Sequence, residues 1–517
     1  MINIVGSGLA GLSAAISLAY RGIGCNLISV EESQRAQSVM AEGGINAALN
    51  TMGEDDNVLE HFEDTLKGGA FLGEESAIRG LTENAPKIVE WLRSLGVPFE
   101  CKDGRIVQRN FGGQKKKRTA YVKSSTGKML MSALIDEARK YEIKGLIRRF
   151  DHHEVYDLLI ENDECRGLKM QDLYTGKAYE MYGPVLLCTG GLTRMFPGLT
   201  TGSRDNTGLL LSRLFLKGLR LANLEMIQYH PTTINITGKR LLVSEAARGE
   251  GGRFMTYKDG KPYYFMEDMY PEYGNLVTRD VASRAIWKIQ HDPSCKGVYL
   301  DMTGLDKNIW DNKLSDMRNE LLDYTGIDIA KEPFEIGPGI HYFMGGIKVD
   351  DMHKTSIKDL YAAGECACKY HGANRLGGNS LLGAIYGGKV VGEHIARDDD
   401  DSIKEIDNDY QIVDDAYSNR IKDILVSGMG IIRNKESIED SIRRIDELLD
   451  NEHNQSRYAK TILAKAMLMC ALNRNESRGA HYREDYPETN DDFLKTTVVS
   501  FKDDIVIEYA DIDGGRE

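Results

Sequence analysis

The first 32 residues constrain the fold more strongly than any other part of the chain. The segment INIVGSGLAGLSAAISLAYRG places an apolar run before Gly6, Gly8 and Gly11 and a helical pattern after them, and CNLISVE then gives a second apolar run that ends at Glu31. In such a β–α–β unit the first glycine allows a tight turn, the second lets a pyrophosphate approach the backbone, and the third lets helix and strand pack closely. The acid can accept hydrogen bonds from ribose hydroxyls. The segment predicts a dinucleotide-binding domain, but its spacing does not choose between FAD and NAD.

A second glycine-rich segment, RAQSVMAEGGINAALN, follows the predicted second strand. A nicotinamide-binding unit would normally continue into a crossover helix here. Instead, Gly43 and Gly44 remove side chains where a flat ring could lie against the backbone. An ordinary glycine loop is the alternative interpretation of this fragment, and the rest of the chain shifts the balance towards FAD.

Two later apolar segments predict further strands of the same sheet. GPVLLCTGG, residues 183–191, and IKDLYAAGECA, residues 357–367, both end in glycine. The nucleotide-binding domain would then be interrupted by an inserted unit. We predict an α/β fold with a Rossmann-like FAD-binding domain at 1–224 and 336–397, an insert at 225–335, and a helical domain at 398–517.

Composition limits the classes of partner. With 517 residues, two or three domains are expected, and no run approaches the roughly 18 apolar residues of a membrane span. The net charge of −14 argues against nucleic acid and anionic membrane surfaces as partners. The chain opens directly with a strand-like segment, and its eight cysteines show no dense pairing pattern. We therefore expect a cytoplasmic protein with reduced thiols and no metal site.

The polar motifs of the later chain carry a family resemblance. EGGINAAL, QYHPT, SEAARGEGG, TRDVASRAI, HYFMGGI, HGANRLGGNSLL and NESRGAHYREDYP occur in this order over nearly the whole chain. Together they resemble the flavoprotein subunit of fumarate reductase and succinate dehydrogenase, whose family also includes L-aspartate oxidase. The resemblance implies that the cofactor is FAD, that the insert is an α+β capping and substrate domain, and that a helical domain follows.

The resemblance also implies roles for the polar residues. His230, Ser244, His341 and Arg375 would bind a small dicarboxylate, and a planar guanidinium suits a carboxylate because it can bind both oxygens. Arg279 would be the proton donor opposite the flavin N5. The implied catalytic set is Arg279, Glu245, Arg248 and His230. Taken singly, each has a plainer interpretation as a packed histidine or an ion-pair partner, whereas the ordered set favours a site.

The FAD contacts combine the glycine unit with the later motifs. The predicted cofactor-binding residues are Gly6, Ser7, Gly8, Ala10, Gly11, Glu31, Ser38, Gly43, Gly44, Glu365, Arg375, Ser380 and Leu381. Many respiratory members carry a histidine at the position of Gln37, and that histidine binds FAD covalently. Glutamine cannot form this bond, so we expect noncovalent FAD. Ser244 replaces a common threonine and keeps its hydroxyl.

Substrate and electron partner separate the remaining hypotheses. L-aspartate oxidase typically has an acid where NFGGQKKKRTAY has Phe111, and an apolar residue favours a substrate without an amine. Fumarate and succinate therefore lead, mainly as fumarate reduction, with L-aspartate as the alternative and another unsaturated acid or a nonenzymatic binding module behind it. The cysteines offer no iron–sulfur spacing. We expect an iron–sulfur partner subunit and, through it, a membrane anchor at the cytoplasmic face of the plasma membrane.

Overall fold

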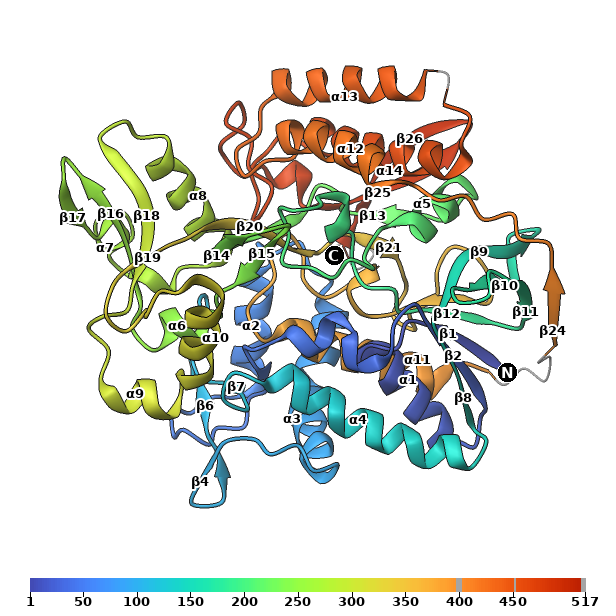
Figure 1. Ribbon diagram of the computed structural model, residues 1–517, viewed down its shortest axis with the longest axis horizontal. Helices are drawn as coiled ribbons and strands as arrows, with labels where there is room; N and C mark the ends of the chain where they lie inside the picture. The colour runs from blue at the N-terminus through green and yellow to red at the C-terminus, as the bar shows by residue number, and fades with distance from the viewer. Residues whose placement is uncertain (397–401, 451, 513–517) are drawn as a thin grey trace.

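A parallel five-stranded sheet forms the centre of the nucleotide-binding part. The computed structural model describes residues 1–396, 402–450 and 452–512, and the strand order in this sheet is β22-β12-β1-β2-β8 (Figure 1). The bounds are β1 Ile2–Val5, β2 Cys25–Ser29, β8 Ile147–Asp151, β12 Val185–Leu187 and β22 Leu360–Ala362. The two strands predicted from residues 183–191 and 357–367 are therefore both confirmed: β12 pairs with β1, and β22 pairs with β12.

Helices α1 and α4 contact strands of this sheet. Helix α1 contacts both α11 and α4, and α11 also contacts α3. A Cβ added to Gly388 of α11 would lie 2.2 Å from the Ala10 carbonyl oxygen, so this glycine permits the close approach of α1 and α11. The helices of this part are α1 Leu9–Tyr20, α2 Val58–Gly68, α3 Glu75–Ser94, α4 Thr126–Ile143, α5 Leu209–Leu216 and α11 Asn379–His394.

A second, antiparallel sheet flanks the first. Its order is β24-β11-β10-β9, formed by Ile403–Ile406, Ala178–Tyr182, Glu164–Asp172 and His153–Glu161. The predicted boundary between residues 397 and 398 lies outside the described residues. The segment that follows begins with strand β24 at the edge of this sheet, and only later becomes helical.

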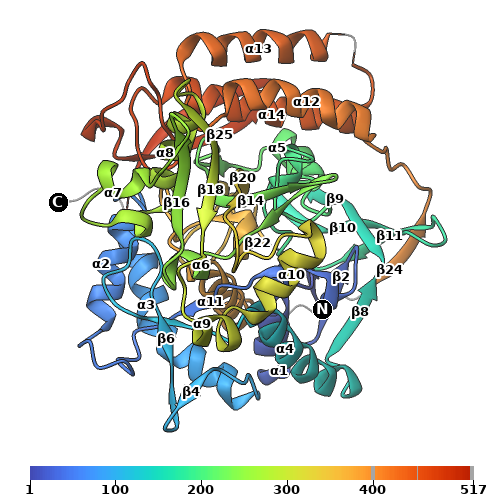
Figure 2. The ribbon, with the colours of Figure 1, turned by 60° about the vertical axis from the view of Figure 1, so that its left-hand side comes forward.

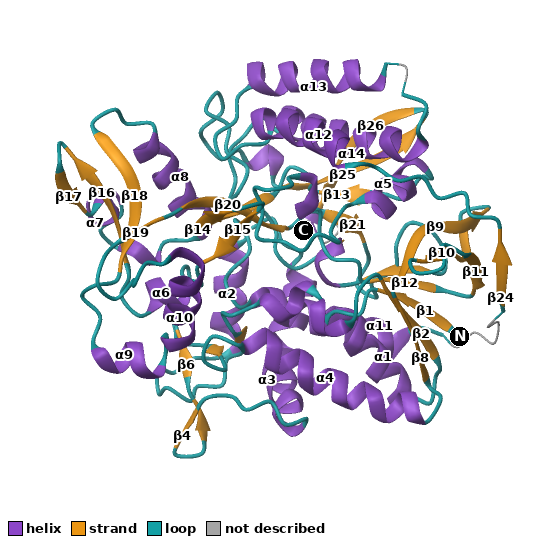
Figure 3. Ribbon diagram, viewed as in Figure 1, coloured by secondary structure: helices purple, strands orange, loops and turns teal. Residues whose placement is uncertain are grey.

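The insert mixes strands and helices (Figure 3). Long strand β14, Ile227–Ile236, pairs with β15, Lys239–Leu242, and with β20, Gly337–Phe343. Apolar side chains of the insert form a separate core that includes Phe254, Ile286 and Trp310. The remaining elements are α6 Ala246–Gly249, β16 Arg253–Lys258, β17 Lys261–Tyr263, α7 Phe265–Met269, α8 Arg279–Gln290, β18 Cys295–Asp301, α9 Lys307–Asn312, α10 Ser315–Thr325 and β19 Phe334–Glu335.

Three helices dominate the C-terminal part and lie together in Figure 2. They are α12 Asp415–Gly428, α13 Lys435–Leu449 and α14 Gln455–Asn473. In α13 the side chains of Ile438, Ser441, Ile445 and Leu448 recur at three and four residues and are buried, as in an amphipathic helix. The Asn434 side chain caps this helix by accepting a hydrogen bond from the Ser437 N–H at 2.8 Å.

The C-terminal part also contains a β-hairpin that the sequence pattern did not predict. Strands β25, Lys495–Lys502, and β26, Asp504–Asp511, pair along their full length. The hairpin joins a five-stranded sheet with β13 Leu221–Ala222, β21 Gly346–Lys348 and β23 Ala367–Cys368, all from the earlier chain. Among the described residues, no helix is both long and apolar enough to cross a membrane.

Candidate active site

Two adjoining cavities lie at the ends of the parallel strands. The nucleotide cavity is lined by Gly6, Ser7 and Glu31, and the central cavity by residues that include Gly43 and Arg375. Both cavities share a set of lining residues, namely Gly8, Gln37, Ser38, Cys188 and Gly190. The two cavities therefore adjoin as one elongated space, which suits a long dinucleotide with a ring system at one end.

The turn after β1 requires glycine at two positions, because a side chain there would collide with the backbone. Gly6 has a φ of 110°, and a Cβ there would lie 2.2 Å from the Cys188 carbonyl oxygen. A Cβ on Gly11 would lie 1.9 Å from the Gly6 carbonyl oxygen, so the third glycine serves packing and does not line a cavity. Gly8 caps helix α1 and faces the junction of both cavities. The start of α1 is thus open to an anionic group such as a pyrophosphate.

The second glycine pair lines the central cavity beside an arginine. Gly44 has a φ of 138°, and a Cβ there would lie 2.5 Å from the Ala120 carbonyl oxygen. Arg109 donates to the carbonyl oxygens of Gly43, at 3.2 Å from Nε, and of Glu42, at 3.3 Å from Nη2. Sequence reasoning missed Arg109, although it directly precedes the NFGGQ segment. Its guanidinium holds the glycine loop in place against the cavity.

Glu245 joins two arginines in the buried part of the site. Arg279 Nη2 lies 2.7 Å and Nε 2.9 Å from Glu245 Oε2, and Arg248 Nη2 lies 3.1 Å from Oε1. The Gly112 N–H donates to the same Oε1 at 2.9 Å. Burial opposes ionisation of Glu245, but the two guanidinium charges outweigh it and hold its pKa below the usual value. Arg279 and Glu245 line the central cavity, and Arg248 lies behind them.

Gln228 connects two arginines that line the central cavity, Arg279 and Arg375. Its Oε1 accepts from Arg279 Nη1 at 3.2 Å, while its Nε2 donates to Asn374 Oδ1 at 2.9 Å and to the Arg375 carbonyl oxygen at 2.7 Å. Sequence reasoning did not single out Gln228, although it opens the QYHPT motif. The three contacts fix the side chain of Gln228 and restrict that of Arg279.

Two histidines face the same cavity from neighbouring strands. The ring centroids of His230, in β14, and His341, in β20, are 5.0 Å apart, and Thr201 Oγ1 lies 2.7 Å from His341 Nδ1. Burial, and then the charge of Arg279, lower the pKa of both imidazoles well below the usual value. Both rings are therefore neutral at pH 7. Thr201 was missed by the sequence reasoning.

Arg375 is a buried guanidinium that makes no ion pair with a carboxylate among the described residues. Its side chain is 2% exposed, and its Nε and Nη2 have no hydrogen-bond partner among the described residues. It lies over the Tyr342 ring at 4.3 Å from the centroid. Burial, and then repulsion by Arg279, lower its pKa to about 9. A cation in this environment is stabilised by an incoming carboxylate, which would supply the missing acceptor.

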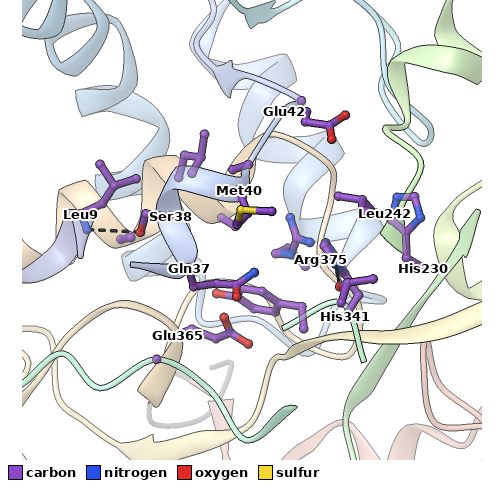
Figure 4. Close-up of a pocket in the computed structure, with 18 of the residues that line it drawn as sticks. Leu9, Gln37, Ser38, Met40, Glu42, His230, Leu242, His341, Glu365 and Arg375 are labelled. Atoms are coloured by element: carbon purple, nitrogen blue, oxygen red, sulfur yellow. Dashed lines mark hydrogen bonds between the residues drawn. The ribbon is translucent and has the colours of Figure 1, made fainter. Parts of the chain in front are cut away.

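The remaining predicted residues line the central cavity, and Ser38 among them also lines the nucleotide cavity. Glu365 lies in the central cavity and accepts from the Phe343 N–H at 3.1 Å, and burial raises the pKa of its carboxyl to about 7. Ser38 Oγ accepts from the Leu9 N–H at 3.3 Å. Ala10, Ser244, Ser380 and Leu381 also line the central cavity. In Figure 4, Leu9 and Ser38 lie on one side of this cavity and His230, His341 and Arg375 on the other.

Comparisons with known proteins cover the chain almost from end to end. Residues 2–381 match the family model of the FAD binding domain, and residues 459–515 match that of the fumarate reductase flavoprotein C-terminus. The succinate dehydrogenase flavoprotein subunit of Bacillus subtilis is 39% identical, over 99% of this chain and 96% of that protein. The L-aspartate oxidase of Pyrococcus furiosus is 32% identical, over 96% and 98%.

A solved structure gives the same result for the fold. A variant of E. coli quinol fumarate reductase superposes with a TM-score of 0.87 and 29% identity, over 99% of this chain and 96% of that one. The predicted α/β fold is confirmed by this match, and the predicted cofactor, FAD, by the family model.

Proposed function

The chain belongs to the family of FAD-dependent oxidoreductases that contains the flavoprotein subunits of fumarate reductase and succinate dehydrogenase, and on this premise we propose that it interconverts fumarate and succinate, mainly by reducing fumarate. One observation carries the proposal: the unpaired, buried Arg375 shares a cavity with the Arg279–Glu245 pair. The first can hold a carboxylate and the second can move a proton.

Four side chains would bind the two carboxylates of the substrate. Arg375 offers two free nitrogen donors to one carboxylate. His230, His341 and the Ser244 hydroxyl line the same cavity and can donate to the other. Because the imidazoles are neutral, they contribute hydrogen bonds and no net charge. A small dicarboxylate held at both ends would expose its central carbons to reaction.

The residues present also fit FAD. Gly8 and the start of α1 suit the pyrophosphate, and Glu31 in the same cavity suits a ribose. When bound, FAD supplies the hydride through its N5. Gln37 lines the junction of both cavities and offers no nucleophile for a covalent bond. We therefore expect acid precipitation of the holoprotein to release essentially all of its flavin, and flavin retained by the precipitate would contradict this expectation.

Arg279 would donate the proton. In fumarate reduction one central carbon accepts the hydride and the other accepts a proton from the Arg279 guanidinium. An arginine side chain is already protonated at neutral pH and cannot take up a further proton, so proton delivery is easier to achieve than abstraction, which favours reduction over oxidation. Glu245 is hydrogen-bonded to Arg279 and paired with Arg248, so it can pass a replacement proton to Arg279.

L-aspartate oxidation is the second candidate, and Glu42 is the residue whose carboxyl could bind the ammonium group of that substrate. Its carboxyl lines the central cavity, and its Oε2 has no hydrogen-bond partner among the described residues. However, burial and then Glu320 raise the pKa of Glu42 to about 8, so the group is mostly neutral at pH 7 and is a poor partner for an ammonium. Phe111, also in this cavity, is 1% exposed. Both features favour a substrate without an amine.

Steady-state assays separate the two candidates. The purified holoprotein should reduce fumarate with reduced viologen faster than it oxidises succinate or L-aspartate with a dye acceptor. Vigorous aspartate oxidation without fumarate reduction would overturn the proposal.

The electrons for fumarate reduction would come through an iron–sulfur partner subunit. That subunit would in turn bind a membrane anchor on the cytoplasmic side. Direct NADH oxidation by the isolated chain, and purification from its host without an iron-containing partner, would contradict this arrangement.

A further inference from the structure

Arg240 lies on the same sheet as the histidines of the active site, further from its centre. It belongs to β15, and the alternation of a strand puts its side chain on the same face as Leu242, which Figure 4 shows beside the histidines. A Cβ on Gly339 would lie 3.2 Å from Arg240 Cγ, so the two residues are adjacent across the sheet. His341 follows Gly339 by two residues, roughly 7 Å along β20.

Two glycines let the Arg240 side chain lie against the strand. A Cβ on Gly337 would lie 3.3 Å from Arg240 Nη1, and one on Gly339 would also lie 2.9 Å from Thr233 Oγ1. Larger residues at these two positions would push the guanidinium away. The backbone of Arg240 is fixed by its own N–H, which donates to the Thr200 carbonyl oxygen at 3.1 Å. The position of this cation is therefore built into the sheet.

The Arg240 guanidinium is partly buried, and no ion pair within the described residues offsets the cost of burying its charge. Its Nε is buried and has no hydrogen-bond partner among the described residues, and no ion pair joins it to a carboxylate there. Burial lowers its pKa. Arg279 and Arg248 share Glu245, whereas Arg240 makes no ion pair with a carboxylate in the described part of the chain. Like Arg375, it is a cation whose environment would be improved by an anion.

Arg240 also lines two spaces. One is the central cavity, and the other is a peripheral hollow lined by Thr233, Asn235, Gln290, Tyr324 and Glu335, among others. The guanidinium therefore stands where the hollow and the central cavity approach each other. An anion that passed from the hollow to the central cavity would therefore pass this cation.

We propose that Arg240 is an outer carboxylate subsite, which holds one end of an incoming dicarboxylate before that anion reaches Arg375 and the two histidines. This proposal rests on the proposed function, because it takes a small dicarboxylate as the ligand. A cation at such an entry raises the association rate and makes it depend on ionic strength, while the chemical step depends on other groups.

The test measures the association rate of a dicarboxylate with the oxidised holoprotein. Malonate, which cannot be reduced, is mixed in a stopped-flow instrument and the flavin absorbance is followed. We expect Arg240→Gln to lower the association rate constant about tenfold and to flatten its dependence on ionic strength between about 20 and 200 mM. Arg240→Lys keeps the charge and should retain most of the rate. The value of kcat/KM for fumarate should fall with the association rate constant.

Lys261→Gln is the matched control. It removes the same charge from an exposed side chain of the insert that lines neither the central cavity nor the peripheral hollow, so a general effect of net charge would slow both variants equally. The proposal requires a clearly larger loss in Arg240→Gln. An unchanged association rate in Arg240→Gln would overturn the subsite and leave the substrate assignment standing. Absence of any flavin response to malonate, fumarate or succinate in the unmodified protein would overturn both.

Discussion

At the scale of single residues, the active site contains several buried arginines, two of which share one carboxylate. Arg279 and Arg248 share Glu245, while Arg375 keeps free donors. Burying an unpaired charge is costly, and proteins tolerate it where a ligand of opposite charge binds. The arrangement therefore separates two tasks: the paired arginine can exchange protons with its carboxylate, and the unpaired one can hold an anion.

Substitution of Arg279 tests the first task. We expect Arg279→Gln and Arg279→Lys to lower kcat for fumarate by about 100-fold or more, because proton delivery in the transition state is lost, while FAD remains bound. Lys288→Gln removes an exposed cation from the same helix and should keep full activity. Turnover in the Arg279 variants equal to that of the control would refute the assigned role.

Glu42 gives a prediction for pH. Its carboxyl pKa is raised to about 8 in the folded chain from an ordinary 4.5, mainly by burial. Between these values the folded state binds more protons than the unfolded state, so this group lowers stability as the pH rises towards 8. Glu42→Gln should therefore raise the melting temperature of the holoprotein at pH 9, on the order of 2 °C or more, and change it little at pH 4.5. Exposed Glu90→Gln should have no effect at either pH, and an equal shift at both pH values in Glu42→Gln would contradict the raised pKa.

At the scale of elements, the turn from β1 to α1 depends on backbone contact. Gly11→Ala would drive a Cβ into the Gly6 carbonyl oxygen, at 1.9 Å in the unrelaxed structure. Strand and helix must then separate, which moves the start of α1 away from the pyrophosphate position. We expect the purified variant to carry much less FAD, measured as the ratio of flavin to protein absorbance. Gly304→Ala meets open space and should keep its flavin, and full flavin content in Gly11→Ala would show that the turn tolerates a side chain.

The same elements show how far sequence reasoning can reach. The segments around Gly6, 183–191 and 357–367 were predictable because short apolar runs ending in glycine carry a local signal for parallel strands. Strand β24 and the hairpin of β25 and β26 were not, because a charged region hides them and their partners, β11 and β13, lie more than 200 residues earlier in the chain. Nonlocal pairing leaves little trace in a local pattern.

The site divides in the same way. Glu245 and His341 could be named from the sequence, because the family resemblance assigns roles to them. Gln228, Thr201 and Arg109 could not, because their importance lies in contacts across the fold: Gln228 touches Arg279 and the backbone of Arg375, and Thr201 touches His341. A polar residue within or beside a motif carries no signal of the partner that the fold will bring to it.

At the scale of the whole molecule, a buried ionic network connects the C-terminal part to the strand that carries the active site. Arg474 Nε lies 2.7 Å from Glu225 Oε1, both side chains are 0% exposed, and Thr497 Oγ1 donates to the same oxygen at 2.6 Å. Glu225 lies two residues before the start of β14, the strand that bears Gln228 and His230. The network thus joins α14, the C-terminal hairpin and the active-site strand through one carboxylate.

Removal of this carboxylate should destabilise the whole chain. Glu225→Ala leaves Arg474 with Glu476 alone, and breaking a buried pair from one side typically costs about 3–5 kcal/mol. Asp440→Ala breaks the exposed pair with Arg443 on α13, which should cost less than about 1 kcal/mol. Urea unfolding followed by circular dichroism and by flavin fluorescence measures both. If the network joins the parts into one unit, both signals of Glu225→Ala shift together to lower urea. A loss of helical signal well before the flavin is released would instead mean that the C-terminal part unfolds independently of the active-site strand.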